Sequence, residues 1–224
     1  LKSLGAKKIK FLGNLKFSES KSQKNYNFHN KLKKIFKYKR IWCAASTHNS
    51  EEKICALAHK KLKSKYKNLL TIIIPRHIQR SNNIINEIKD LDLNVQIRSA
   101  DNKISKNTDI YLVDSYGETK SFYKICKTVF LGGSLINHGG QNPLEPARFG
   151  CKILHGPYVQ NFSEVYNFLE KNNLSSKFHN TEQLVNSVKK SFSTKTNFTN
   201  KTIKLKKMGS YILNKTFTDI SNYL

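Results

Sequence analysis

The chain has 224 residues, of which 38% are hydrophobic and 11% aromatic, enough to bury a sizeable core and to exclude a disordered chain. Its formal net charge is +25, but 35 of the 40 basic residues are Lys and five are Arg. Sites that read bases or clamp phosphate favour Arg, and the lysines are spread over every predicted helix, so we expect no nucleic-acid partner. A basic surface of this kind is attracted to an anionic membrane surface instead.

Neither a membrane-spanning segment nor a metal site is predicted. No apolar run approaches the roughly 20 residues that cross a bilayer, so any membrane anchor is expected outside this sequence. The cysteines lie far apart without a CxxC pair, which indicates reduced, buried thiols; they are Cys43, Cys55, Cys126 and Cys151. The histidines are equally dispersed, and we expect neither a metal nor a cofactor.

The first forty residues differ from the rest of the chain. Leu1 stands where an initiator Met would be expected, and no signal peptide follows it. We interpret residues 1–40 as the tail of an N-terminal domain missing from this sequence, followed by an interdomain lead-in that begins at Ser18.

From residue 41 onward, short apolar runs alternate with segments of helical periodicity, the pattern of a parallel α/β sheet. Strands are predicted at 41–45, 69–74, 95–98, 110–113, 128–131 and 151–154. Helices are predicted at 50–65, 81–90, 117–127, 143–149, 162–171, 181–192 and 203–223. This alternation predicts one Rossmann-like, doubly wound domain over 41–224, with the last helix as its C-terminal element.

Polar motifs follow four of the predicted strands. They are Ser46-Thr47-His48, Pro75-Arg76-His77, the segment 114–118 and the glycine-rich segment that begins at Gly132. In doubly wound sheets, ligands bind outside the carboxyl ends of the strands. We therefore expect these four loops to converge on one binding site.

The glycine-rich segment, GGSLINHGGQNPLEPARFGCKILHGP at 132–157, indicates a nucleotide. Its glycines allow backbone amides to approach phosphate oxygens, and a helix N-terminus after Asn142-Pro143 would add partial positive charge. Glu145, in the first turn of that helix, could accept hydrogen bonds from ribose hydroxyls. The alternative is a purely structural strand-loop-helix turn, because short glycine motifs also occur by chance.

The run HGGQNPLEP at 138–146 resembles the signature of the Kdo transferases, which move 3-deoxy-D-manno-octulosonic acid (Kdo) from its CMP ester onto lipid A precursors. The resemblance extends over nearly the whole chain, at 13–17, 46–48 with 51–52, 75–77 with Arg80, 117–118, 132–135, 139–146, 156–157 and 161–162. Such enzymes are similar to other two-domain glycosyltransferases of the GT-B type, with the donor nucleotide mainly on the C-terminal half. The resemblance therefore implies that this chain is the C-terminal, donor-binding half of a Kdo transferase that acts in lipopolysaccharide core biosynthesis.

The resemblance also implies roles for individual residues. Three loops match CMP-contacting segments of the family, and their residues are Pro75, Arg76, Tyr116, Gly117, Glu118, Asn142, Pro143, Leu144 and Glu145. A guanidinium at Arg76 can clamp phosphate or stack against cytosine. Lys16 matches a lysine that would stabilise the charge on the departing CMP phosphate. Ser46, Thr47 and His48 are candidates for binding the carboxylate of the sugar.

In the family, the general base and the acceptor surface belong to the N-terminal domain. The resemblance thus implies that this chain alone is inactive, and that the complete enzyme lies at the inner membrane, facing the cytoplasm. Glu51 and Glu52, in the first turn of the predicted helix at 50–65, are interpreted as capping charges rather than as a replacement base.

Departures from the family pattern are local. Ile78 and Gln79 replace a usual Pro-Glu, and Ser50 replaces a usual Gly. Two alternatives stay open: another nucleotide-sugar glycosyltransferase or epimerase of the same fold, and, outside the enzymes, a basic RNA-binding module. The RNA-binding alternative is disfavoured because the sequence lacks aromatic stacking motifs.

Overall fold

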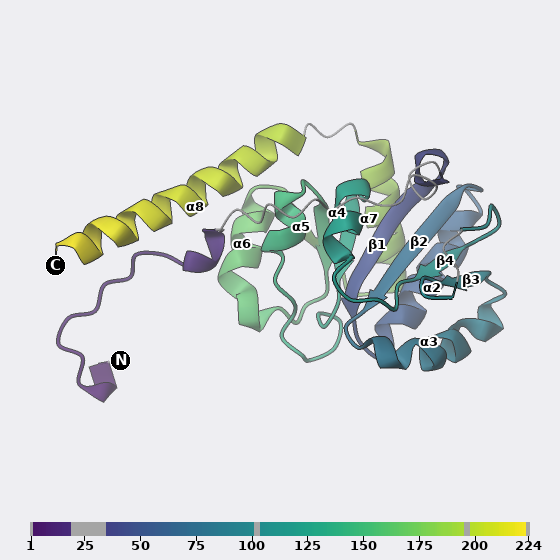
Figure 1. Cartoon of the computed structure of the whole chain (residues 1–224), viewed down its shortest axis with the longest axis horizontal. Helices are drawn as coiled ribbons and strands as arrows, with labels where there is room; N and C mark the ends of the chain where they lie inside the picture. Colours follow the sequence, from purple (N-terminus) through teal and green to yellow (C-terminus); the bar gives the residue numbers. More distant parts are fainter. Residues whose placement is uncertain (1, 19–34, 101–103, 195–197, 223–224) are drawn as a thin grey trace.

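The computed structural model describes residues 2–18, 35–100, 104–194 and 198–222, and contains a seven-stranded parallel sheet with helices on both faces (Figure 1). The strand order is β3-β4-β2-β1-β5-β6-β7. The strands are β1 (Arg40–Thr47), β2 (Leu69–Pro75), β3 (Val95–Ile97), β4 (Ile110–Leu112), β5 (Thr128–Leu131), β6 (Lys152–His155) and β7 (Ser175–Lys177). The predicted doubly wound α/β fold is confirmed.

The central strands are buried on both sides, which explains why their sequences are continuous apolar runs. Every residue of β2, LLTIIIP, is buried. In β1, alternation sends Trp42 into the core on one face of the sheet and Cys43 into the core on the other, and both are fully buried.

Two helical layers cover the sheet. One layer contains α2 (Glu51–Lys63), α3 (Ser81–Ile88) and α7 (Thr181–Ser193), whose apolar residues share a core with Trp42. The other contains α4 (Thr119–Ile125), α5 (Leu144–Arg148), α6 (Ser163–Lys171) and α8 (Phe198–Ser221), which share a core with Cys43. None of the helices in the described ranges is both long and apolar enough to cross a membrane.

The N-terminal segment runs beside α8 (Figure 1). Its 3-10 turn η2 (Leu15–Phe17) buries Phe17, whose ring lies edge-on to Phe168 at 5.2 Å. A Cβ atom on Gly209 of α8 would lie 2.4 Å from the carbonyl oxygen of Phe17, so this mid-helix glycine permits the close approach of the two segments. Residues 15–17 therefore pack against this domain. The predicted domain boundary between residues 1–40 and 41–224 stays a prediction.

The six predicted strands are all present, with bounds shifted by at most two residues. The seventh strand, β7, was not predicted because its sequence, Ser-Ser-Lys, has no apolar run. The last helix begins five residues earlier than expected, at Phe198. Ser50 does precede α2, but in a left-handed conformation and without a side-chain capping bond.

Candidate functional site

The topological switch point of the sheet lies between β1 and β5. Strands β2, β4 and β3 lie on one side of β1, in that order outward, and β5 pairs with β1 on its other side. Ligands of doubly wound proteins bind at such a point, outside the carboxyl ends of the strands. The loops after β1, β2, β4 and β5 meet at this edge, as the sequence predicted.

The glycine-rich loop after β5 is held by the buried carboxylate of Glu51, the first residue of α2. Glu51 Oε2 accepts hydrogen bonds from the amides of His48 at 2.9 Å and Gly133 at 2.8 Å, and Oε1 accepts those of Ser134 at 3.1 Å and Leu135 at 2.9 Å. The side chain is fully buried. Burial raises the pKa of Glu51, and the four amide bonds offset part of that effect.

The same loop touches the β1 backbone closely, at a position where only glycine fits. A Cβ atom on Gly132 would lie 2.4 Å from the carbonyl oxygen of Ser46 and 2.5 Å from Cα of Thr47. Ser46 itself has a positive φ of 55° and marks a register shift in the pairing of β1 with β2. This bulge turns the end of β1 toward the loop.

These contacts correct two predictions. The amides of Gly133, Ser134 and Leu135 bind Glu51, so in this structure they are not available for phosphate oxygens. Glu51 is also more than a capping charge, because its carboxylate joins α2 to a loop far away in the sequence. Glu52 is fully buried as well and accepts a hydrogen bond from Arg80 at 2.9 Å.

The loop after β2 supplies Pro75 and Arg76. Pro75 is buried and pairs with Thr47 in the register of β1 and β2. The Arg76 amide donates to the Thr47 carbonyl at 2.9 Å, and the side chain of Arg76 is exposed. The fixed backbone thus presents an exposed guanidinium beside the switch point, while Pro75 can only support it.

The loop after β4 presents Tyr116, a residue that is 68% exposed, and Gly117 in a left-handed conformation. Glu118 is already engaged, because Arg98 donates to its carboxylate at 3.0 Å and Ser115 donates to it as well. Burial alone would raise the pKa of Glu118, but hydrogen bonds from Arg98 and Ser115 lower it. Glu118 therefore stays ionised and orders the loop.

The third predicted segment, 142–145, starts α5. The Asn142 side-chain oxygen accepts the Leu144 amide at 3.0 Å, while Pro143 and Leu144 are buried. Glu145 is partly exposed and lies 3.1 Å from Lys120 of α4. Of these four residues, Asn142 and Glu145 are the two that can offer polar side-chain atoms to a ligand.

Lys16 lies on the exposed surface of η2. Its Nζ atom is 4.6 Å from the ring centroid of Phe162, at the end of the loop after β6. The neighbouring Asn161 donates through its side-chain amide to the carbonyl of His138 in the glycine-rich loop, at 3.2 Å. Lys16 is thus placed at the same edge as the four loops, beside the loop that follows β6.

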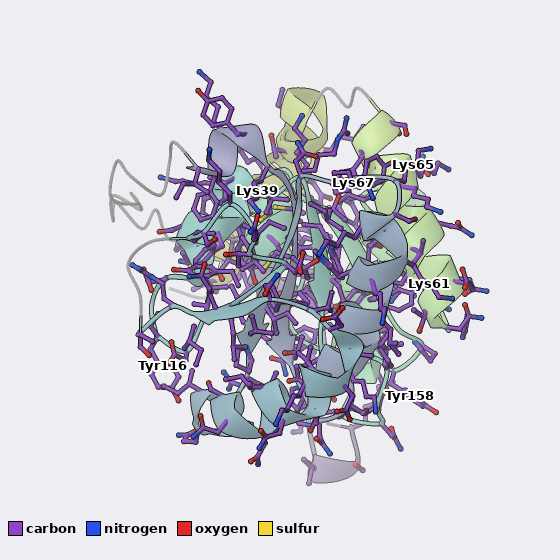
Figure 2. All side chains as sticks on the ribbon, turned by 90° about the vertical axis from the view of Figure 1, so that its right-hand side faces the viewer. Lys39, Lys61, Lys65, Lys67, Tyr116 and Tyr158 are labelled. Carbon is purple, nitrogen blue, oxygen red and sulfur yellow. The ribbon has the colours of Figure 1, made fainter. Side chains whose placement is uncertain are left out.

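Two exposed tyrosines mark this edge of the molecule. Figure 2 shows Tyr116 and Tyr158 in the lower half of the molecule, whereas Lys39, Lys65 and Lys67 lie in the upper half. Tyr158 follows β6, is 41% exposed, and donates its amide to Ser134 at 3.0 Å. The sequence analysis did not single out Tyr158; its position directly after the Gly156-Pro157 motif was the available signal.

Histidines also gather here, although the sequence suggested that they were dispersed. His48, His77 and His138 come from the loops after β1, β2 and β5 and lie side by side. Their positions in loops that follow predicted strands could have indicated this. Within the described ranges, no group of three or more His, Cys, Asp or Glu residues has an arrangement suited to a metal ion.

No protein-family model matches the chain. Among curated proteins, the 3-deoxy-D-manno-octulosonic acid transferase of Haemophilus influenzae is 37% identical over 160 residues, which are 71% of this chain and 38% of that protein. The protein of the same name from Rickettsia conorii is 33% identical over 162 residues, 72% of this chain and 35% of that protein. The chain thus spans little more than a third of the length of these relatives.

Two solved structures place the fold. The C-terminal CMP-Kdo binding domain of WaaA from Acinetobacter baumannii is 26% identical, with a TM-score of 0.68 over 80% of this chain and 91% of that one. A trehalose 6-phosphate synthase from Burkholderia multivorans has a TM-score of 0.53 over 86% of this chain and 44% of that one; at 9% identity, it supports the fold alone.

The sheet order, the switch point and these neighbours define a Rossmann-like domain of the GT-B glycosyltransferase fold. The matches in sequence and structure extend over most of the chain and agree with each other. The chain belongs to the Kdo transferase family and corresponds to the C-terminal domain of its members.

Proposed function

We propose that this chain binds CMP-Kdo and forms the donor site of an enzyme that transfers Kdo to a lipid A precursor in lipopolysaccharide core biosynthesis. One observation carries the proposal: the chain aligns with 91% of a solved domain described as CMP-Kdo binding, and with transferases that carry the name of this sugar. The switch-point loops agree with it, because exposed Arg76 and Tyr116 and partly exposed Glu145 lie at the carboxyl edge of the sheet.

The proposed contacts to CMP follow from the polar groups and ring faces that these side chains can offer to a ligand. Arg76 offers an exposed guanidinium for the phosphate, and the ring of Tyr116 can stack on cytosine. Glu145 would accept the ribose hydroxyls, with Asn142 beside it. Pro75, Gly117, Pro143 and Leu144 would contribute backbone shape, and Glu118 would hold its loop in place.

The reaction would be displacement of CMP at the anomeric carbon of Kdo. Positive charge next to the leaving phosphate would lower the barrier, and we assign this role to Arg76 and Lys16. We propose that the general base lies in an N-terminal domain, that residues 1–40 connect to that domain, and that 41–224 alone transfers no sugar. The complete enzyme would act at the cytoplasmic face of the inner membrane, where basic residues favour anionic lipid.

A different nucleotide-sugar donor is the leading alternative. The chain is also 34% identical over 169 residues to a bifunctional glycosyltransferase/methyltransferase of Fusobacterium nucleatum, which covers 26% of that protein. Calorimetry with CMP, UMP and UDP separates the two possibilities. We expect CMP to bind most tightly, whereas equal or tighter binding of a uridine nucleotide would favour the alternative.

Glu145→Gln should weaken CMP binding by about 1–3 kcal/mol, roughly 5- to 150-fold, because the ribose hydroxyls lose a charged acceptor. The matched control is Lys120→Gln, which removes the same ion pair at 3.1 Å but keeps the carboxylate. We expect the control to bind CMP within about threefold of the unmodified chain. If both variants lose CMP affinity equally, the ion pair rather than a ribose contact explains the effect.

A further inference from the structure

Three imidazoles from three different loops meet at the switch point. The ring centroids of His48 and His138 are 4.4 Å apart, and those of His48 and His77 are 6.1 Å apart. We call these three residues the histidine cluster. They follow β1, β2 and β5, the three adjacent strands at the centre of the sheet, so the cluster lies where this fold binds ligands.

The surrounding backbone leaves space for this cluster. A Cβ atom on Gly133 would lie 3.1 Å from Cδ2 of His138 and 3.2 Å from Cε1 of His48, so glycine makes room for both rings. His48 is nearly buried, with 11% of its side chain exposed. Its position is fixed by the bulge at Ser46, whose carbonyl oxygen lies 3.1 Å from Nδ1 of His48.

That contact determines which nitrogen of His48 can meet a ligand. A carbonyl oxygen only accepts hydrogen bonds, so Nδ1 carries a proton and donates it to Ser46. Among the described residues, Nε2 has no hydrogen-bond partner. In the neutral ring Nε2 is an acceptor, and on protonation it becomes a donor aimed at an anion.

The groups around His48 disfavour protonation of its ring until an anion binds. Burial lowers the pKa of His48, and the neighbouring His138, His77 and Arg76 lower it further, against the opposing Ser46 carbonyl. The acidic group on the other side is Glu51, 4.0 Å from Nδ1, and its carboxylate already accepts four amides. An incoming anion would remove the mutual repulsion.

Three other cations at this edge are already paired with acidic groups, while Lys16 lies over the ring of Phe162. Arg80 binds Glu52 at 2.9 Å, Arg98 binds Glu118 at 3.0 Å and Lys120 binds Glu145 at 3.1 Å. In the described part of the chain, by contrast, Arg76, His77 and His138 have no acidic partner within 4 Å. Apart from Lys16, which we assign to the leaving phosphate, the positive and protonatable groups left for an anion are therefore those of the cluster and Arg76.

We propose that the histidine cluster is the subsite for the carboxylate of the donor sugar, and that His48 takes up a proton from solvent when this carboxylate binds. This inference rests on the proposed CMP-Kdo function. In that donor the carboxylate and the phosphate are attached to the same anomeric carbon. A phosphate bound at Arg76 therefore brings the carboxylate next to His77 and His48. Of the three residues that the sequence analysis named for this carboxylate, Ser46, Thr47 and His48, Thr47 is fully buried and cannot take this role.

The test compares three ligands by calorimetry: CMP, a non-hydrolysable CMP-Kdo analogue, and the same analogue with its carboxylate converted to a carboxamide. We expect the carboxylate analogue to bind more tightly than the carboxamide. Its affinity should fall by up to about tenfold per pH unit as the pH rises from 6 to 8, since binding takes up a proton. The carboxamide and CMP should show much flatter pH profiles.

His48→Gln and His138→Gln should each weaken the carboxylate analogue by about tenfold, the effect of losing one charge-assisted hydrogen bond, and leave CMP within about twofold. His138 is exposed, so its variant keeps the test valid if His48→Gln fails to fold. The control is His179→Gln, at an exposed histidine two residues before α7, and this variant should bind all three ligands like the unmodified chain.

Each outcome has a distinct meaning. Loss of CMP and of the analogue in equal measure would assign the cluster to the phosphate and overturn the carboxylate subsite. Equal affinity for carboxylate and carboxamide, with a flat pH profile, would overturn it as well. No binding of CMP to the unmodified chain would instead contradict the proposed function itself.

Discussion

Glu51→Gln should lower the free energy of unfolding by roughly 2–4 kcal/mol, because the new NH2 group would face amides that now donate to a carboxylate. Four backbone amides converge on Glu51 within 3.1 Å, and its side chain has no exposed surface. At least one buried amide would lose its acceptor. Urea unfolding followed by circular dichroism measures the change.

The matched control is Glu182→Gln, on α7. Its side chain is 63% exposed and forms an ion pair with Lys61, so we expect a change within about 0.5 kcal/mol. Amide hydrogen exchange at 133–135 should accelerate in Glu51→Gln and not in the control. A Glu51→Gln variant as stable as the control would mean that the four amide bonds do not hold the loop.

The burial of Glu51 and Glu52 bears on the chemistry of the site. Neither carboxylate is exposed, and each already has fixed partners, the loop amides for Glu51 and Arg80 for Glu52. Glu118 is paired with Arg98. A general base must reach the proton it removes, and none of these three side chains is free to do so. This agrees with the proposal that the base lies in another domain.

The fold was predictable because its central strands can be recognised from their amino-acid composition. In a parallel sheet covered on both faces, strands such as β2, LLTIIIP, must be apolar throughout, and they stand out between helical segments. The edge strand β7, Ser-Ser-Lys, has no such constraint, since its pairing depends on β6 alone. Its sequence therefore carries no pattern that distinguishes it from a loop.

The positions of the candidate loops were predictable from the sequence, but the hydrogen bonds that hold them were not. The order of strands and loops indicated which segments meet at the switch point, including 75–76, 116–118 and 142–145. The glycine-rich motif indicated available amides, but not that Glu51, 82 residues before Gly133, accepts them. Such long-range hydrogen bonds depend on how α2 docks on the sheet, which no local pattern encodes.

A second buried network, far from the switch-point loops, links α2 to the start of β4. Asp109 Oδ1 lies 3.3 Å from Nε2 of His59, while its Oδ2 accepts from Nζ of Lys63 at 2.8 Å and from the amide of Asn94 at 3.0 Å. On the other side of the ring, Nδ1 of His59 is 2.8 Å from Oγ1 of Thr71. His59 is fully buried and Asp109 is 4% exposed, so solvent cannot replace these partners.

Asp109→Asn should therefore lower the free energy of unfolding by about 2–4 kcal/mol at pH 7, because one side-chain oxygen becomes a donor facing other donors. Asp90→Asn is the control, since Asp90 is exposed at the end of the α3 region, and its change should stay within about 0.5 kcal/mol. Urea unfolding of both variants at several pH values measures the difference. An effect no larger than that of the control would show that the network contributes little.

The pH dependence of this difference distinguishes a charged network from simple packing. Burial alone would raise the pKa of Asp109, but hydrogen bonds from His59, Lys63 and Asn94 lower it well below its ordinary value of 3.8. The stabilisation is therefore complete above about pH 5 and is lost as the pH falls through 3.8 toward the folded-state pKa, because the unfolded chain then binds the proton first. Burial also lowers the pKa of His59 below 6.5, against the opposing effect of Asp109, so the unmodified chain loses stability as the pH falls below that value and Asp109→Asn, without that carboxylate, should lose more. The gap between the two proteins should thus stay wide from pH 7 to 5 and narrow below pH 4. A gap that stays constant down to pH 3 would show that Asp109 acts through its shape rather than its charge.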